Sequence, residues 1–350
     1  MPDHETYMLR CLELAACGAG SVSPNPMVGS LIVADGVIIG EGYHRAYGEP
    51  HAEANAIADV LRSHTNAEEL LRRATLYVNL EPCAHFGKRP PCSDLIIRYQ
   101  IPTVVIGCRD PFKLVDGKGI DKLKNAGILV VEDVLSEQSK ALNRRFFTRV
   151  EKQRPYIILK WAQTNDGFFA PADGGQRWIS SPASRRLVHK WRAEEDAVLV
   201  GKNTVLADNP QLNTRLWPGK NPVRIVVDRN LELPETLHVF DGTQKTIVFN
   251  AKKTELHDHV KYLELEDFDN LLPQLICYQL YLMDIQSLII EGGATMLNFF
   301  IAAGLWDEAR VFTGSENWSA GLRAPALPGN LVSTEQIDSD ILQIYTNQPK

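Results

Sequence analysis

The chain lacks a long apolar run and lacks an excess of positive charge. No apolar stretch in its 350 residues approaches the roughly 18–20 residues that a transmembrane helix needs, so we expect no membrane partner. Its 37 basic and 43 acidic side chains give a formal charge of −6. A mildly acidic protein has no broad basic field to bind phosphate backbones. We therefore expect no nucleic-acid partner.

Export signals and a disulfide framework are also missing. The first ten residues, MPDHETYMLR, contain neither a basic segment nor an apolar core, so we expect no signal peptide and a cytoplasmic location. The sequence has six cysteines. In a chain of this size without a signal, cysteines are expected to be reduced core residues or metal ligands.

The order of apolar and polar segments predicts two α/β domains. Single cores seldom grow past roughly 250–300 residues, so the length favours two domains. Strand-like runs alternate with segments of helical periodicity in both halves, which predicts an α/β fold with mostly parallel sheets. Residues 136–154 are polar and basic and are expected to form a helix that runs into a connector. The alternation resumes at Pro155, which predicts domains over 1–149 and 150–350.

Four residues of the first half have the order expected of a hydrolytic metal site. His51 and Glu53 open a predicted helix, Cys83 follows a predicted strand, and Cys92 begins the next helix. One imidazole and two thiolates bind Zn²⁺ with an open fourth position for water, whose pKa the metal lowers. Glu53 would lie beside the metal and pass the water proton to departing ammonia. The pattern therefore predicts a deaminase.

A structural zinc site is the main alternative, because it would need only one more protein ligand. The candidates for that ligand are His44, His85 and Cys108. The carboxylate two residues after His51 favours the catalytic interpretation. Eight residues, AHFGKRPP, separate the two cysteines, whereas the usual deaminase signature has two. We expect this insertion to lie near the metal and to place His85 and Lys88 beside the substrate.

Several segments of the first half resemble the deaminase domain of the bifunctional riboflavin-biosynthesis deaminase/reductases. These segments are SPNPMVG (23–29), HAE (51–53), EPCAHFGKRPPC (81–92) and CRDPFKLVDGKGI (108–120). The resemblance implies a cytidine-deaminase-like α/β/α domain that deaminates 2,5-diamino-6-(5-phosphoribosylamino)pyrimidin-4(3H)-one. It implies a catalytic Glu53 and Zn²⁺ held by His51, Cys83 and Cys92. The implied substrate contacts are Asn25, His44 and Lys88.

The second half has neither a metal motif nor a G-x-G-x-x-G after its first strand, so a Rossmann dinucleotide site is not supported. Glu291, Gly292 and Gly293 end an apolar strand and open a helix, where backbone amides can approach a pyrophosphate. Arg192 and Arg215 are candidates for a bidentate grip on a substrate phosphate. From the residues alone, solvated arginines and a plain glycine turn remain the simpler interpretations.

Segments of the second half resemble the reductase domain of the same family. They are KWAQTNDG (160–167), the tryptophan at 178, GKNTVLADNPQLNTR (201–215) and EGGAT (291–295). The resemblance implies a dihydrofolate-reductase-like fold and NADPH-dependent reduction of the ribosyl chain of 5-amino-6-(5-phosphoribosylamino)uracil to ribityl. The implied cofactor contacts are Ala162, Trp178, Thr204, Asp208, Gly293, Ala294 and Thr295. The implied substrate contacts are Gln176, Arg192, Leu212, Arg215 and Glu291.

Two other functions stay open at this stage. One is a tRNA base deaminase with an appended recognition domain, which the acidic charge disfavours. The other is a zinc-stabilised binding module, which requires four protein ligands at the metal. Because dimers are the commonest assemblies of such enzymes, we expect a homodimer or a homotetramer.

Overall fold

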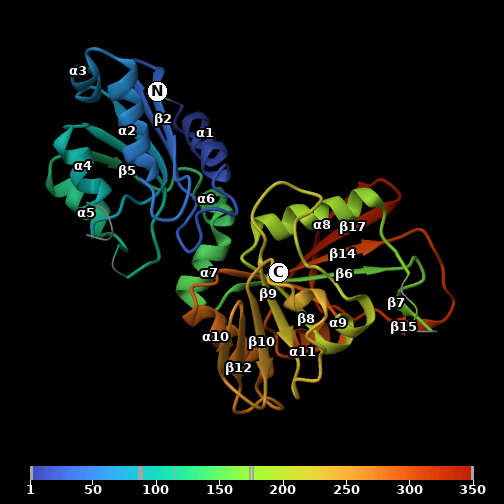
Figure 1. Cartoon of the computed structure of the whole chain (residues 1–350). Helices are drawn as coiled ribbons and strands as arrows, with labels where there is room; N and C mark the ends of the chain where they lie inside the picture. Colours follow the sequence, from blue (N-terminus) through green and yellow to red (C-terminus); the bar gives the residue numbers. More distant parts are fainter. Residues whose placement is uncertain (1–2, 86–89, 114, 173–174, 176, 348–350) are drawn as a thin grey trace. The chain divides into compact units, whose positions relative to one another are not determined.

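The computed structural model of the chain describes residues 3–85, 90–113, 115–172, 175 and 177–347 (Figure 1). Contacts divide the chain into two compact units, Met1–Gln153 and Arg154–Lys350. The division falls just after helix α7 (Arg144–Lys152), so this whole helix belongs to the first unit. Among the described residues, no helix has the length and apolarity needed to span a bilayer.

The first unit is built on a five-stranded sheet of order β2-β1-β3-β4-β5. Its strands are β1 (Gly29–Ala34), β2 (Val37–Tyr43), β3 (Thr75–Leu80), β4 (Thr103–Cys108) and β5 (Leu129–Val131). We expected a mostly parallel sheet, but β1 pairs antiparallel with both β2 and β3, and only β3, β4 and β5 run parallel. The two-residue turn at Asp35 and Gly36 explains the β1–β2 pairing, because such a turn joins only antiparallel strands.

Helices cover both faces of this sheet (Figure 1). They are α1 (His4–Ala16), α2 (Ala52–Ser63), α3 (Ala67–Leu71), α4 (Cys92–Arg98), α5 (Lys118–Asn125), α6 (Ser136–Leu142) and α7. The period-2 alternation of β1 supplies both cores. Leu31 and Val33 pack with α1, while Ile32 and Ala34 pack in the cluster that contains α2, α4 and α5. Sheets of this kind bind ligands in the loops at the carboxyl ends of their parallel strands, which here are the ends of β3 and β4.

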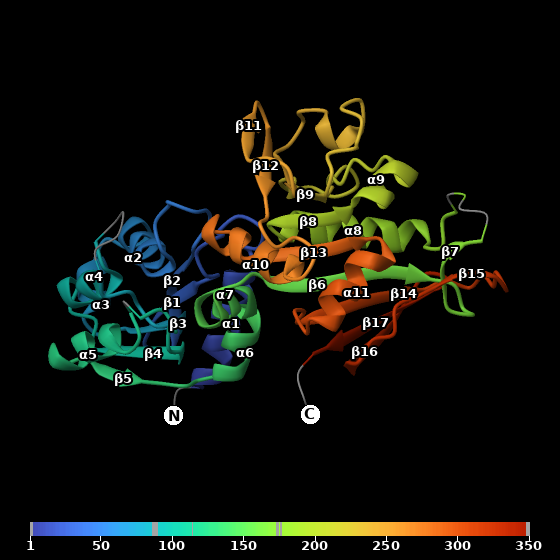
Figure 2. The same cartoon turned by 90° about the horizontal axis from the view of Figure 1, so that it is seen from below.

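The second unit contains a ten-stranded sheet of order β11-β12-β10-β9-β8-β13-β6-β14-β17-β16 and a two-stranded sheet of β15 and β7 (Figure 2). The strands are β6 (Tyr156–Gln163), β7 (Phe168–Pro171), β8 (Ala197–Gly201), β9 (Val223–Val227), β10 (Thr246–Asn250), β11 (Glu255–His257), β12 (Val260–Glu264), β13 (Ser287–Gly292), β14 (Glu308–Thr313), β15 (Gly321–Arg323), β16 (Asn330–Ile337) and β17 (Asp340–Thr346). Strands from β12 to β14 along this order pair in parallel, as predicted.

Two pairs of helices pack against the larger sheet. Helices α10 (Leu272–Leu282) and α11 (Ala294–Ala302) contribute Ile276, Leu280 and Phe300 to the largest apolar cluster of the unit. Helix α8 (Pro182–Glu194) packs Val188 and Trp191 in a separate cluster, and α9 (Lys202–Asp208) packs in a third. A 3₁₀ turn, η1 (His238–Phe240), completes the described helices. The carboxyl ends of β6, β8 and β13 lie side by side in this sheet and open toward one cavity.

Candidate functional site

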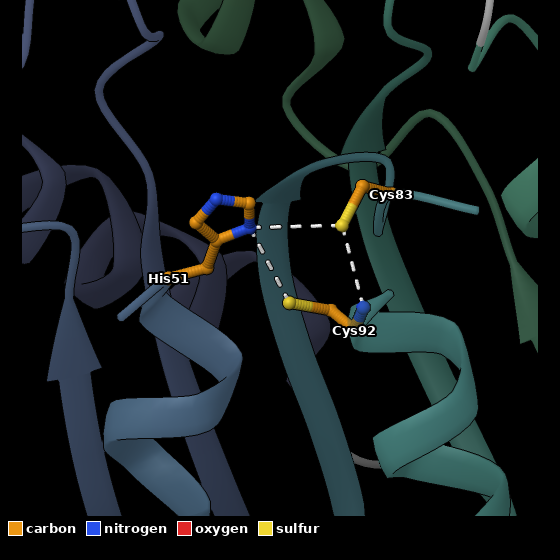
Figure 3. Close-up of side chains that lie close together, drawn as sticks. All are labelled: His51, Cys83 and Cys92. Atoms are coloured by element: carbon orange, nitrogen blue, oxygen red, sulfur yellow. Dashed lines mark hydrogen bonds between the residues drawn. The ribbon is translucent and has the colours of Figure 1, made fainter. Parts of the chain in front are cut away.

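Three side chains of the first unit form a cluster that can hold a metal ion (Figure 3). The Nδ1 atom of His51 lies 3.6 Å from Cys83 Sγ and 3.5 Å from Cys92 Sγ. His51 caps the N-terminus of α2, Cys83 follows β3, and Cys92 begins α4. Their ligand atoms all lie within 4.8 Å of one another. One nitrogen and two sulfurs at this spacing fit the tetrahedral preference of zinc with one position open.

A fourth protein ligand does not join this cluster among the residues that the structure describes. His44 is engaged at Nδ1 by the Pro50 carbonyl, and Cys108 donates from its thiol to the carbonyl of Asn79. His85, the third candidate, lines the neighbouring cavity and is not part of the cluster. Three protein ligands among the described residues disfavour the structural-zinc alternative, because that site closes its coordination shell with four protein atoms.

The cluster favours a cation because its Cys83 side chain is readily ionised. A hydrogen bond from the Cys92 thiol lowers the pKa of Cys83 well below its usual range, and His51 adds to the effect. The backbone amide of Cys92 also donates to Cys83 Sγ over 3.3 Å. Glu53 is 3% exposed, and burial followed by the nearby Cys83 charge raises the pKa of its carboxyl to about 7. A cation bound to the triad would oppose that rise.

A cavity of about 330 Å³ opens over the cluster and contains two of the predicted substrate contacts. Asn25 and His44 both line it, and Asn25 Nδ2 lies 3.1 Å from His44 Nε2. Burial lowers the pKa of His44, so its ring is neutral near pH 7 and can accept from the amide. The third predicted contact, Lys88, lies outside the described residues.

The loop after β4 forms another wall of this cavity, through Asp110, Phe112 and Val115. Buried Glu81 holds that loop, because its carboxylate accepts from the amides of Gly117 (3.0 Å) and Gly119 (2.9 Å), among others. A side chain at Gly119 would meet the carbonyl of Pro82, so only glycine fits this close approach. Burial raises the pKa of Asp110 to about 7.

A second cavity, of about 620 Å³, lies at the carboxyl ends of β6, β8 and β13 in the second unit. All described residues that we predicted for the reductase site line it. They are Ala162, Trp178, Arg192, Thr204, Asp208, Leu212, Arg215, Glu291, Gly293, Ala294 and Thr295. Gln176 lies outside the described residues. One cavity thus brings together segments that are more than a hundred residues apart in the sequence.

The turn between β13 and α11 is built for close backbone approach. Gly293 has φ +77°, a left-handed conformation that side chains disfavour, and it directly precedes the first residue of α11. A Cβ at Gly292 would meet the side chains of Thr204 and Val200 at 2.9 Å. The exposed amides of this helix N-terminus are suited to bind a phosphate group.

A buried ionic cluster forms the floor of the second cavity. Arg192 donates from Nε and Nη2 to the two carboxylate oxygens of Glu291, at 2.6 and 2.7 Å, and from Nη1 to the carbonyl of Asn213. Although burial alone would raise it, the Arg192 charge and hydrogen bonds lower the pKa of Glu291 to about 2. Lys160 Nζ lies 4.0 Å from Glu291, and burial lowers the pKa of this lysine.

Arg192 already has a partner in the second cavity. The sequence offers Arg192 and Arg215 as candidates for a bidentate grip on a phosphate, and Arg192 uses its guanidinium fork on Glu291. A substrate contact at Arg192 stays a prediction. Arg215 donates from Nη1 to Asn213 Oδ1. A carboxylate buried as deeply as Glu291 needs a paired cation. Arg192 supplies that charge, so its guanidinium fork is occupied before any ligand binds.

Among the residues that line the two cavities and that sequence reasoning missed are Glu81, Asp110, Arg149 and Lys160. Lys160 and Asp110 stand inside segments that resemble the family, yet an isolated lysine or aspartate has no motif of its own. Glu81 directly precedes the P-C pair, and that adjacency was an available signal. Arg149 lies in the basic segment 136–154, which we expected to form a helix that runs into a connector and which carries no motif of a binding site.

Comparisons with known proteins agree with this geometry. Residues 1–108 match the family model described as the cytidine and deoxycytidylate deaminase zinc-binding region. Residues 155–316 match the model described as the RibD C-terminal domain. The second match disfavours a tRNA deaminase with an appended recognition domain, because that residue range is a reductase domain.

Full-length relatives cover both units. The riboflavin biosynthesis protein RibD of Aquifex aeolicus is 43% identical over 327 residues, which cover 91% of this chain and 88% of the relative. A diaminohydroxyphosphoribosylaminopyrimidine deaminase/5-amino-6-(5-phosphoribosylamino)uracil reductase from Thermotoga maritima superposes with a TM-score of 0.90, at 40% identity and 98% coverage of each chain. RibD of Acinetobacter baumannii superposes with a TM-score of 0.89, at 35% identity and 98% coverage of each chain.

Proposed function

This chain belongs to the RibD family of bifunctional deaminase/reductases in riboflavin biosynthesis, and we propose that its first unit deaminates 2,5-diamino-6-(5-phosphoribosylamino)pyrimidin-4(3H)-one. The observation that carries the proposal is the convergence of His51, Cys83 and Cys92 beside the buried carboxyl of Glu53. This donor set suits zinc and leaves one position for water. The family's deaminase domain binds zinc and its reductase domain uses NADPH.

In the deaminase reaction, water replaces the amino group on a ring carbon and ammonia leaves. Zinc held by the triad supplies a Lewis acid that lowers the pKa of water. Glu53 takes a proton from the water at its carboxylate and returns it to the departing nitrogen. Its burial keeps bulk water away from this transfer. Asn25, neutral His44 and Asp110 provide polar groups around the ring, and Lys88 remains a substrate contact proposed from the sequence.

We assign the second cavity to NADPH-dependent reduction of the ribosyl chain of 5-amino-6-(5-phosphoribosylamino)uracil. NADPH supplies the hydride that reduces the carbon of the open imine. The turn at Gly293, Ala294 and Thr295 offers backbone amides to the cofactor's pyrophosphate. Ala162, Trp178, Thr204 and Asp208 form the rest of the proposed cofactor wall.

The remaining residues of the second cavity serve the substrate. Arg215 binds its phosphate, while Leu212 and the Arg192–Glu291 pair form the adjoining wall, and Gln176 stays a proposal from sequence. Addition of hydride to an imine carbon leaves a nitrogen that needs a proton. Lys160 is a largely buried lysine in this wall, and its lowered pKa eases proton donation from Nζ.

One coupled assay tests both assignments. The zinc-loaded protein is given the diaminopyrimidine ribosyl phosphate, and ammonia release and NADPH consumption are followed together. We expect ammonia release without NADPH, and NADPH consumption only after ammonia has formed. NADPH oxidation that precedes ammonia release would contradict the proposed order, and no ammonia would refute the first assignment.

The proposal extends to assembly and location. Strand β16 is an edge strand with Leu331 and Val332 51% and 62% exposed, and such an edge can pair with a second copy. We propose a homodimer or homotetramer, and a monomer in analytical ultracentrifugation would refute it.

All six cysteines are free, which supports a reducing, cytoplasmic location. Cell fractionation tests that location.

A further inference from the structure

The cavity over the metal cluster is lined by a strongly acidic set of side chains. Its described acids are Glu49, Glu53, Glu81 and Asp110. Among the described residues that line it, Arg149 is the one lysine or arginine. A ribosyl phosphate carries up to two negative charges, and such a group is repelled by carboxylates in a cavity of low dielectric. A basic side chain close to the phosphate would offset that repulsion.

Arg149 reaches this cavity because of how helix α7 packs. Phe146 and Val150 of the helix contact Leu80 and Cys108, the last residues of β3 and β4. Phe146, Arg149 and Val150 are spaced i, i+3 and i+4, so they share one helix face. All three line the cavity. The apolar contacts thus fix the helix, and the guanidinium is presented at the carboxyl ends of the strands, where α/β sheets bind ligands.

A second contact fixes α7 against the segment that carries Asn25. Asn143, the N-cap position of α7, accepts from the amide of Met27 at 2.8 Å and donates to the Met27 carbonyl at 2.9 Å. Met27 follows Asn25, which lines the same cavity. Asn143 is 2% exposed, so this pair of hydrogen bonds is shielded from water. The basic segment is therefore a wall of the deaminase site.

We propose that Arg149 binds the 5-phosphate of the substrate in the deaminase site. The inference rests on the proposed deaminase function and names the residue that selects for a phosphorylated substrate. A planar guanidinium matches phosphate oxygens bidentately, which a lysine ammonium does not. Arg149 in the first unit and Arg215 in the second would then each recognise the same phosphate of successive intermediates.

The test compares two substrates that differ only in the phosphate. Ammonia release is measured with zinc-loaded Arg149→Ala on the pyrimidine ribosyl phosphate and on its dephosphorylated analogue. We expect kcat/KM to fall roughly 10- to 100-fold for the phosphorylated substrate, the size of a lost charged hydrogen bond. The dephosphorylated analogue should change less than about 2-fold, and Arg149→Lys should keep part of the selectivity.

Three further variants make the result decisive. Arg72→Ala is the matched control, because Arg72 is exposed and pairs with the exposed Glu68, and its loss should alter activity on neither substrate. If Arg149→Ala loses zinc, Arg149→Gln replaces it, since it keeps much of the side chain. Lys88→Ala tests the competing phosphate partner. A phosphate-selective loss in Lys88→Ala but not in Arg149→Ala overturns the assignment.

The outcomes separate this inference from the function on which it rests. Equal losses on both substrates, or no loss, refute Arg149 as the phosphate partner while wild-type ammonia release still supports the deaminase. Failure of the zinc-loaded wild type to release ammonia from either substrate overturns both statements.

Discussion

The pKa values of the buried carboxyls are shifted in opposite directions in the two cavities. In the first unit, burial raises the pKa of both Glu53 and Asp110 to about 7, and zinc held by the triad would oppose the rise at Glu53. In the second unit, the Arg192 charge overcomes burial and lowers the pKa of Glu291 to about 2. A carboxyl near neutrality can exchange protons during a reaction, whereas a paired carboxylate is a fixed charge. The difference matches hydrolysis in one site and hydride transfer in the other.

The metal site is easier to predict from the sequence than the nicotinamide site, because the two sites depend on different kinds of groups. Metal chemistry needs particular atoms, so imidazole, thiolate and carboxylate recur at defined positions. A nicotinamide site relies on backbone amides, small side chains and one helix N-terminus, which many sequences supply. The C-terminal cavity is also nearly twice the volume of the first, about 620 against 330 Å³, and more segments share its wall.

Metal removal should separate the two activities most completely. Chelation of the purified protein should abolish ammonia release, because zinc is the group that lowers the pKa of the attacking water in the proposed mechanism. NADPH-dependent reduction of the already deaminated substrate should be unchanged. Re-addition of zinc should restore deamination. Parallel loss of both activities would contradict the independence of the sites.

Replacement of Glu53 should have the next largest effect. Glu53→Gln keeps the shape of the side chain but removes the proton acceptor, so we expect kcat for deamination to fall by roughly 10²- to 10⁴-fold. Zinc content by atomic absorption should stay at the wild-type level, and reduction should be unaffected. Full deaminase activity in this variant would remove Glu53 from the mechanism.

The Glu291–Arg192 pair predicts acid sensitivity of the second unit. The folded pKa of Glu291 is depressed, so the pair's contribution is complete above the unfolded pKa and is lost as the pH falls toward 2. We expect a loss on the order of 3 kcal/mol between about pH 5 and pH 2. All six tryptophans lie after residue 155, so urea unfolding followed by tryptophan fluorescence reports this unit alone.

The control for that experiment is Glu291→Gln. This variant should be less stable at pH 7 and should lose less stability on acidification than the wild type. If wild type and variant show the same pH dependence, another group carries the acid sensitivity.

The smallest expected effect sharpens the comparison of the two phosphate sites. Arg215→Ala should weaken reduction of the phosphorylated substrate by about 10-fold or more, and its dephosphorylated analogue far less. Deamination should not change. Equal losses for both substrates would remove Arg215 from phosphate binding, and selective loss of deamination would reverse the assignments of Arg149 and Arg215.

Much of the fold follows from local patterns. Local sequence correctly predicts the β1 strand with its turn at Asp35, and it predicts β6 and β13 from their long apolar runs. The strands after Glu308 were harder, because β16 is almost wholly exposed and carries little apolar periodicity. Likewise, the basic segment over 136–154 gives two helices that meet at Asn143, and nothing local marks α7 as a wall of a cavity.

The sequence by itself determined the chemistry of the metal cluster, because imidazole, thiols and a carboxylate cannot be replaced by other groups in that role. It also determined the α/β character of both units through hydrophobic periodicity. Only the tertiary structure decided that Arg192 pairs with Glu291, that Lys160 lines the second cavity, and that Arg149 lines the first. These roles depend on burial and on partners far away in the chain, which residue type and local spacing do not encode.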